Sequence, residues 1–227
     1  MTSAPGRFER VAHRGSPSQR RENTLSGFLL ALEHGADAIE LDVHRTVDGV
    51  VIVHHDPRVQ GRLIEESTWE ALAGTDLGSG ARIPTLAETL ASIGERAVVY
   101  VELKGRAIEQ AVIDVLRAHG RRFAVHSFDH AAVERAALLA PDIPRGVLLD
   151  ENVLDAARAM RTAVALTLAR DVWPHWTLVD EVLMDVAREL GLRVIPWTVN
   201  SPAAARRLVA LGVHGVCTDD VRMLANL

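Results

Sequence analysis

The stretch DAIELDVHRTVDGVVIVHHD, residues 37–56, reads as two β-strands joined by a tight turn. Both halves are rich in Val and Ile, which is typical of strands. Asp48-Gly49 is a dipeptide that favours a two-residue type I′ turn, so the sequence predicts a β-hairpin whose second half returns antiparallel to the first. In that register Asp42 lies opposite His55.

Polar side chains gather on one face of this predicted hairpin. Because successive side chains of a strand point to opposite faces, Glu40, Asp42 and His55 share a face, whereas His54 points to the other. A three-residue loop with a bulge would shift the register by one residue and favour His54 instead. Two acids and an imidazole on one patch indicate a site for a metal ion and for proton transfer.

Strand-like and helix-like segments alternate along the rest of the chain. Eight segments read as parallel strands: 8–13, 37–44, 97–103, 123–127, 145–149, 163–168, 192–199 and 215–218. Eight βα units predict an α/β fold of the (β/α)₈ TIM-barrel type, formed by residues 1–227 as a single domain with a hairpin extension and a short insertion at 57–96. An open doubly wound sheet is the alternative, but no Gly-rich dinucleotide fingerprint follows the first strand.

The composition narrows the class of protein. Hydrophobic residues make up 48% of the chain, enough for a full core, and a net charge of −5 argues against nucleic acid as a partner. Cys217 is the one cysteine, so no internal disulfide is expected. Since no signal segment and no run of about 18 apolar residues occurs, we expect a cytoplasmic protein without stable membrane association. The sequence leaves the oligomeric state open.

Further polar residues fall at the predicted strand ends, where the active sites of such barrels lie. His13 and Arg14 end the first strand, and Glu102 and Lys104 end the third. Lys104 is the single lysine among 25 basic residues, which points to a position that needs a compact ammonium group. One histidine or acid at a strand end is usually structural, but several at one rim favour a functional site.

The predicted cluster combines carboxylates and cations. Glu40, Asp42 and Glu102 would make an all-oxygen site that suits Mg²⁺ or Ca²⁺. Arg14 and Lys104 would hold phosphate oxygens, the first through its planar fork and the second as a point charge. The sequence therefore predicts a divalent-cation site that binds a small phosphate-containing substrate.

His13 and His55 complete the predicted chemistry. Imidazoles titrate near neutral pH, so the pair is suited to act as general base and general acid on either side of a phosphorus atom. Phosphodiester hydrolysis is the reaction that these groups fit. Either water or a neighbouring hydroxyl of the substrate is a suitable nucleophile.

Short segments in order along nearly the whole chain carry a family resemblance. They are HRG (13–15), ENT (22–24), ELD (40–42), TVDG (46–49), HDP (55–57), ELK (102–104), HSFD (126–129), WTVN (197–200) and TD (218–219). With these segments the sequence resembles the glycerophosphodiester phosphodiesterases of the short bacterial, cytoplasmic type. The resemblance implies a (β/α)₈ barrel that uses a divalent cation to hydrolyse glycerophosphodiesters to sn-glycerol 3-phosphate and an alcohol.

The resemblance also implies a role for each matching residue. The implied roles are acid and base for His13 and His55, metal ligands for Glu40, Asp42 and Glu102, phosphate contacts for Arg14 and Lys104, and a glycerol contact for Trp197. The family pattern therefore favours His55 over His54. Two departures affect loops: Arg21 stands where the family usually has proline before ENT, and TDDV lacks the usual proline after TD.

Two other functions remain as alternatives. A phospholipase acting on lipid headgroups would use the same barrel, with the segment around Trp173 and Trp176 as its candidate membrane contact. A non-catalytic phosphate-binding barrel is the other alternative, and the complete set of acids, histidines and cations argues against it.

Overall fold

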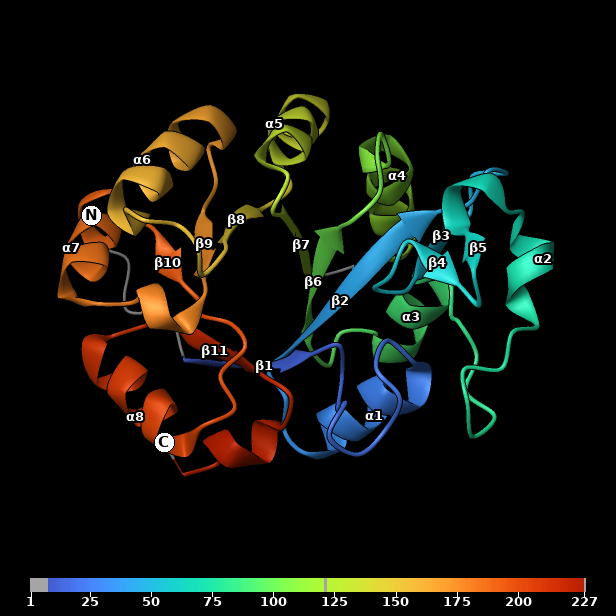
Figure 1. Cartoon of the computed structure of the whole chain (residues 1–227), viewed down its shortest axis with the longest axis horizontal. Coiled ribbons are helices and arrows are strands. Elements are labelled where there is room, and N and C mark those ends of the chain that lie inside the picture. Colours follow the sequence, from blue (N-terminus) through green and yellow to red (C-terminus); the bar gives the residue numbers. More distant parts are fainter. Residues whose placement is uncertain (1–7, 121, 227) are drawn as a thin grey trace.

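The computed structural model describes residues 8–120 and 122–226, and parallel strands surrounded by helices form its centre (Figure 1). In chain order the strands are β1 (Glu9–His13), β2 (Ala38–Arg45), β6 (Val98–Leu103), β7 (Phe123–Ser127), β8 (Arg145–Leu149), β9 (Asp171–Pro174), β10 (Arg193–Val194) and β11 (Gly215–Thr218). They pair in the order β10-β9-β8-β7-β6-β2-β1-β11. The prediction of a (β/α)₈ barrel is confirmed.

Irregular backbone closes the barrel between β10 and β11. After β10 the chain continues beside β11 without regular pairing, and single hydrogen bonds join the two segments. His214 N donates to Val194 O at 2.8 Å, Cys217 N to Pro196 O at 2.9 Å, and Val199 N to Cys217 O at 2.9 Å. These bonds satisfy backbone groups that an open sheet edge would expose.

Helices cover the outside of the barrel and connect successive strands. They are α1 (Leu25–Glu33), α3 (Leu86–Ile93), α4 (Glu109–His119), α5 (His130–Leu139), α6 (Ala156–Thr167), α7 (Glu181–Glu189) and α8 (Pro202–Leu211), followed by the 3₁₀ turn η3 (Val221–Leu224). Thr24, Asp155 and Ser201 are among the side chains that accept a hydrogen bond from the first turn of a helix. No described helix combines the length and apolarity needed to cross a bilayer.

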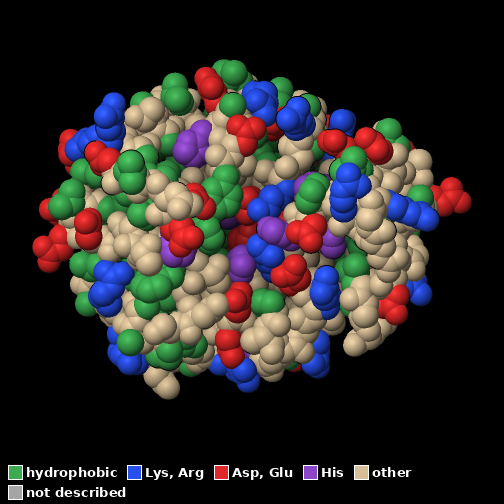
Figure 2. All heavy atoms as spheres, in the orientation of Figure 1, with side chains coloured by type: hydrophobic (Ala, Val, Ile, Leu, Met, Phe, Trp, Pro, Cys, Tyr) green, Lys and Arg blue, Asp and Glu red, His purple; other side chains and the backbone are tan. Residues whose placement is uncertain are grey.

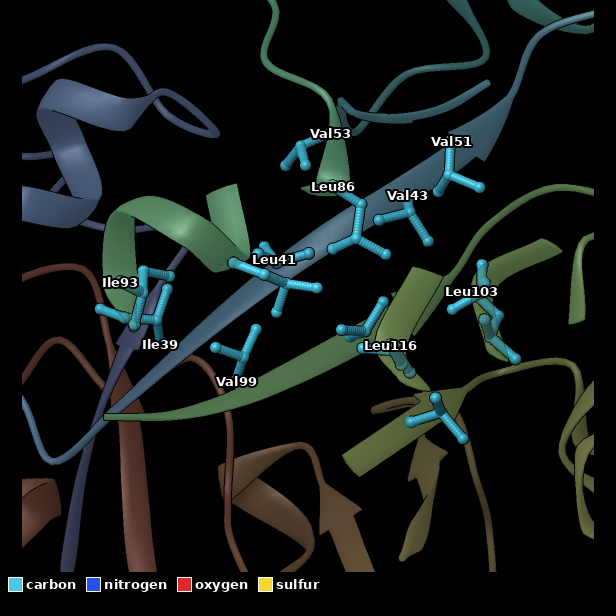
Figure 3. Packing of buried hydrophobic residues seen from close by; sticks show 14 of the residues in the cluster. Ile39, Leu41, Val43, Val51, Val53, Leu86, Ile93, Val99, Leu103 and Leu116 are labelled. Carbon is cyan, nitrogen blue, oxygen red and sulfur yellow. The ribbon is translucent and has the colours of Figure 1, made fainter. Parts of the chain in front are cut away.

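The second strand separates the outer core from the site. Ile39, Leu41 and Val43 of β2 point outward and pack with residues of α3 and α4 (Figure 3). The alternate residues Glu40 and Asp42 are 3% and 0% exposed, respectively, and lie on the inner face. The period of two therefore buries two carboxylates inside the barrel.

The turn of the β2–β3 hairpin has three residues, not the predicted two. Thr46 N donates to Val50 O at 2.9 Å, which leaves residues 47–49 as the loop before β3 (Val51–Val53). Gly49 has a φ of 91°, the left-handed conformation that ends a three-residue loop of this kind. The prediction of a type I′ turn was therefore wrong.

The longer loop changes the register but keeps His55 at the site. Val43 pairs with Val53, and His54 N donates to Asp42 O at 3.0 Å, so His54 and not His55 lies in register with Asp42. Because β3 ends at Val53, the chain turns away from the ladder, and the His55 side chain lines the pocket described below.

The predicted strand at 163–168 is also wrong. Most of this segment is the last part of α6, and the strand is β9, which lies in the segment around Trp173. Ala163 and Thr167 are buried on one stripe of the helix, whereas Leu166 is 56% exposed. Trp173 lies on β9 and is 1% exposed inside the barrel, so it offers no membrane contact; the 3₁₀ turn η2 (Trp176–Leu178) follows.

A small subdomain-like insertion follows the hairpin. It contains the antiparallel pair β4 (Arg58–Val59) and β5 (Arg62–Leu63), the turn η1 (Ile64–Glu66) and the short helix α2 (Trp69–Ala73). Its apolar residues Val59, Ile64, Leu72 and Ile83 form a separate cluster together with Ile52 of β3. Helix α3, which ends the predicted insertion 57–96, packs on the barrel between β2 and β6.

Candidate active site

A pocket of about 260 Å³ opens at the C-terminal ends of the strands. Figure 2 shows a central depression in which acidic, basic and histidine side chains gather. The lining residues are His13, Arg14, Glu40, His55, Glu102, Lys104, His126, Phe128, Leu148, Asp150, Trp173, Trp197 and Cys217. Every predicted site residue except Asp42 lines this pocket, and Asp42 is buried next to Glu40 and Glu102.

The three predicted carboxylates form one buried cluster. Glu40 and Asp42 come from β2 and Glu102 from β6, and one oxygen of each lies within 4.8 Å of the others. Asn23 fixes Asp42, because its Nδ2 donates to Asp42 Oδ2 at 2.8 Å and its Oδ1 accepts from Asp42 N at 3.3 Å. Parallel strands in register therefore place the three acids together.

This cluster fits a hard divalent cation. All of its donors are carboxylate oxygens, as Mg²⁺ and Ca²⁺ prefer. Oδ1 of Asp42 is buried and accepts no hydrogen bond from the described residues, although Lys104 Nζ lies 3.4 Å away. An unsatisfied buried oxygen in a group of carboxylates is what a cation-binding site requires.

Two cations flank the acids. Arg14 Nε lies 3.1 Å from Asp42 Oδ2, and Lys104 Nζ lies 2.8 Å from Glu102 Oε1. Both cationic side chains are only partly exposed, 18% and 19%, respectively, so their positions are set by these contacts. Lys104 Nζ also lies 5.7 Å from the centre of the Phe128 ring. The ammonium group of Lys104 thus contacts the carboxylates of Asp42 and Glu102 and the ring of Phe128.

Burial and charge shift the titration of the acids in opposite directions. Burial, the largest influence, raises the pKa of Glu102; Lys104 lowers it, Asp42 and Glu40 raise it, and the result is about 8. Burial also acts to raise the pKa of Asp42, but Arg14 and Lys104 lower it by more, so it falls below its ordinary value. Without a cation, this raised pKa favours the protonated form of Glu102 at neutral pH.

The two predicted catalytic histidines each pair with an aspartate. His13 Nδ1 lies 2.7 Å from Asp219 Oδ1, and His55 Nδ1 lies 2.9 Å from Asp56 Oδ1. Burial lowers the pKa of His13 most strongly, but the hydrogen bond with Asp219 and the charge of Glu40 raise it by more, so the net shift is upward. In both rings Nδ1 is engaged and Nε2 remains for contact with a substrate.

Trp197 is held at the pocket wall by its indole nitrogen. Its Nε1 donates to Trp173 O at 3.0 Å, and its ring meets Phe128 edge-on at a centroid distance of 5.2 Å. The indole therefore offers its ring surface, and not its N–H, to a ligand.

Three polar residues at the site received no role from the sequence. Asn23 and Asp219 lie in the recognised segments ENT and TD, yet their partners Asp42 and His13 are distant in sequence. His126 sits in an apolar strand and in the recognised segment HSFD, and its Nε2 lies 3.6 Å from Glu40 Oε1. Their membership of shared motifs was the one signal that pointed to them.

Comparisons with known proteins agree with this arrangement. Residues 13–223 match the model of the glycerophosphoryl diester phosphodiesterase family. The chain is 30% identical to a glycerophosphodiester phosphodiesterase of Caldanaerobacter subterraneus over 237 residues, which cover 96% of each protein.

Solved structures share the whole fold. A phosphodiesterase of Oleispira antarctica, in complex with the product sn-glycerol-3-phosphate, superposes with a TM-score of 0.87 at 25% identity, covering 96% of this chain and 95% of that one. A glycerophosphodiester phosphodiesterase of Agrobacterium tumefaciens gives 0.86 at 25% identity, covering 97% and 100%. The chain therefore belongs to the glycerophosphoryl diester phosphodiesterase family and is a phosphoric diester hydrolase.

Proposed function

We propose that the enzyme hydrolyses glycerophosphodiesters to sn-glycerol 3-phosphate and an alcohol in a reaction that depends on a divalent cation. The observation that carries this proposal is the meeting of three buried carboxylates, two cations and two aspartate-paired histidines at one pocket. Family membership and the product bound to the Oleispira relative support the same reaction. The identity of the leaving alcohol is left open.

Glu40, Asp42 and Glu102 are the residues that would hold the cation, with Mg²⁺ or Ca²⁺ as the ions that suit their oxygens. When bound, such an ion withdraws electron density from a phosphate oxygen and makes phosphorus easier to attack. Side chains of the protein would bind and orient the phosphate group and would transfer the protons.

Arg14 and Lys104 would bind the phosphate group. In the structure they pair with the acids, and these acids would serve the cation when it is present. With all three carboxylates ionised around a bound divalent ion, the charges of the three acids, the two cationic side chains and the ion would sum to one positive charge. That charge matches the single negative charge of a phosphodiester.

His13 and His55 would act as the acid–base pair. Asp219 and Asp56 engage their Nδ1 atoms and so orient Nε2 toward the pocket. One imidazole would remove a proton from the nucleophile, and the other would protonate the leaving alkoxide. This assignment is compatible with attack by water and with attack by the glycerol 2-hydroxyl through a cyclic phosphate.

Two variants and a chelator test the proposal. His13→Ala and His55→Ala should each lower kcat on a panel of glycerophosphodiesters by about 100-fold or more, because each removes a proton-transfer group. His119→Ala, at the exposed end of α4, is the matched control and should keep full activity. Near-normal turnover in both variants would refute the acid–base assignment, and activity that survives complete chelation would refute the role of the cation.

A further inference from the structure

His126 places two unpaired nitrogens in the interior of the barrel. The side chain is 1% exposed, and neither Nδ1 nor Nε2 has a hydrogen-bond partner among the described residues. Buried polar groups in folded proteins are almost always paired, so a histidine with two unpaired nitrogens needs an explanation. Because both nitrogens are buried, the partner to look for is a neighbouring side chain and not a substrate in the pocket.

The fold fixes the position of this imidazole. His126 lies beside Glu102 in the register of β7 and β6. Its ring meets the Trp173 indole edge-on at a centroid distance of 4.5 Å, and the centre of the Tyr100 ring lies 6.3 Å away. Close packing of this kind leaves a buried ring little room to turn, so the fold sets the direction in which Nε2 points.

Nε2 faces Glu40, one of the three carboxylates proposed to hold the cation. It lies 3.6 Å from Glu40 Oε1, and Glu40 itself is 3% exposed. The other oxygen of this carboxylate, Oε2, accepts a hydrogen bond from Arg14 N at 3.2 Å. A separation of 3.6 Å is longer than a hydrogen bond, and a movement of about 0.5 Å would close it.

The other two carboxylates of the cluster each have a side chain that holds them. Asn23 Nδ2 donates to Asp42 Oδ2 at 2.8 Å. Lys104 Nζ lies 2.8 Å from Glu102 Oε1. Residues that ligate metals in proteins are regularly oriented by such neighbouring groups, and these groups contribute to the affinity for the metal. For the third carboxylate, the side chain in the corresponding place is His126.

We infer that His126 is a positioning residue that holds Glu40 in place as a ligand of the cation, with a proton of the imidazole on Nε2. Buried N–H groups are rarely left unpaired, so the ring proton belongs on the nitrogen that faces a carboxylate. His126 contacts neither the substrate nor the cation and acts through Glu40. The inference rests on the proposed function, because it concerns a ligand of the proposed cation.

The affinity for Mn²⁺ measures this role without an activity assay. Mn²⁺ suits carboxylate ligands, and its free form is counted directly by electron paramagnetic resonance. His126→Leu should weaken Mn²⁺ binding by about tenfold, because Glu40 loses the group that orients it. His126→Gln places an amide N–H close to the position of Nε2 and should restore most of the affinity.

Two further measurements separate positioning from packing. Ser127→Ala, on the same strand, removes a buried hydrogen bond to Leu103 O and should leave the Kd for Mn²⁺ unchanged. In a Glu40→Gln background, His126→Leu should cost far less affinity than in the wild type, since the residue through which it acts has been altered.

Nitrogen-15 NMR of the histidine rings tests the inference on the unaltered protein. It should show a proton on Nε2 of His126. This measurement carries the test even if His126→Leu fails to fold.

Four results would overturn the inference. They are an unchanged Kd in His126→Leu, an equal loss in His126→Gln, an equal loss in the Glu40→Gln background, and an Nε2 without a proton. Failure of the proposed function looks different, because a wild type that does not bind Mn²⁺ would refute the role of the cation itself. A wild type that binds Mn²⁺ with no dependence on His126 would refute this inference alone.

Discussion

Nδ1 of His13 and Oδ1 of Asp219 lie 2.7 Å apart, although 206 positions separate the two residues in the sequence. They meet because β1 and β11 pair in parallel, with Ala12 beside Thr218. Asn200 Nδ2 donates to the other Asp219 oxygen at 2.6 Å, so the carboxylate is held from both sides. Asp219 is therefore built to orient His13 and to stabilise its charged form.

Asp219→Asn should move the pH profile of the enzyme. Loss of the carboxylate removes a hydrogen bond and a charge that raise the pKa of His13, so this pKa falls. The limb of the kcat/KM profile that His13 controls should shift to lower pH, whether His13 acts as acid or as base. We also expect kcat to fall by about tenfold to 100-fold, because the ring loses its orientation. If kcat falls but the pH profile of kcat/KM does not shift, Asp219 has only a structural role and does not set the pKa of His13.

His44 provides a second test of positioning. Its side chain is 7% exposed, and Nε2 donates to the backbone oxygen of His55 at 3.0 Å, just where the chain leaves β3. His44→Phe should lower kcat by about tenfold or more with little change in KM, because His55 loses the contact that fixes its peptide. His44→Gln keeps a donor and should restore part of the rate. Equal losses in the two variants would contradict this account.

The high pKa of Glu102 predicts a pH-dependent response to cations. This pKa rises from 4.5 to about 8 on folding, so the ion-free folded state keeps a proton that the unfolded state releases in this window. The contribution to stability is present below pH 4.5 and is lost as pH rises to about 8, at up to about 1.4 kcal/mol per pH unit. The increase in Tm on adding Mg²⁺ should therefore be larger near about pH 8 than near about pH 6, since the cation binds the ionised carboxylate.

Glu102→Gln serves as the control for this prediction. The amide does not titrate, so the difference in Tm increase between the two pH values should shrink. A wild type that gains the same Tm at both pH values would show that Glu102 binds the cation without releasing a proton, contrary to the prediction.

Arg145 allows stability to be tested apart from catalysis. It begins β8, at the end of the barrel opposite the site, and is 7% exposed. Its Nε donates to Thr167 O at 2.8 Å and its Nη1 to Ile143 O at 2.8 Å. Arg145→Met should lower the free energy of unfolding by about 2–4 kcal/mol in urea titrations, because buried carbonyls lose their donor.

The kcat/KM of Arg145→Met should equal that of the wild type at a temperature where both are folded. Arg161→Met, which breaks an exposed ion pair with Glu189, should change stability far less. A fall in kcat/KM for Arg145→Met alone would show that the two ends of the barrel are coupled.

Site residues that lie on β-strands could be predicted from the sequence, because side chains of a strand alternate between its two faces. Glu40 and Asp42 lie on the inner face as that period requires, and Glu102 on the next strand lies in register with Asp42. The predicted register of the hairpin was wrong because Gly49 suits both a two-residue and a three-residue turn. The three-residue turn is accompanied by tertiary contacts, such as the hydrogen bond that Trp69 N donates to Asp48 Oδ1 at 3.0 Å. Local patterns left this choice open.

Other features depended on partners distant in sequence. The strand β9 was not predicted because Asp171 and Pro174 interrupt its apolar sequence. The C-terminal part of α6 was predicted as a strand because its sequence is a short apolar run, which is compatible with either element. His126 was overlooked because a histidine in an apolar strand is usually structural. Its unpaired nitrogens become visible only when the surrounding atoms are placed.

The joining of β1 to β11 has a consequence for biosynthesis. The ribosome must add 206 residues after His13 before the His13–Asp219 pair can exist. A nascent chain that has folded only its β1, β2 and β6 units would thus have the three carboxylates proposed to bind the cation but would lack the partner of His13. The proposed proton-transfer histidine therefore gains its aspartate only when β11 has been synthesised and has paired with β1.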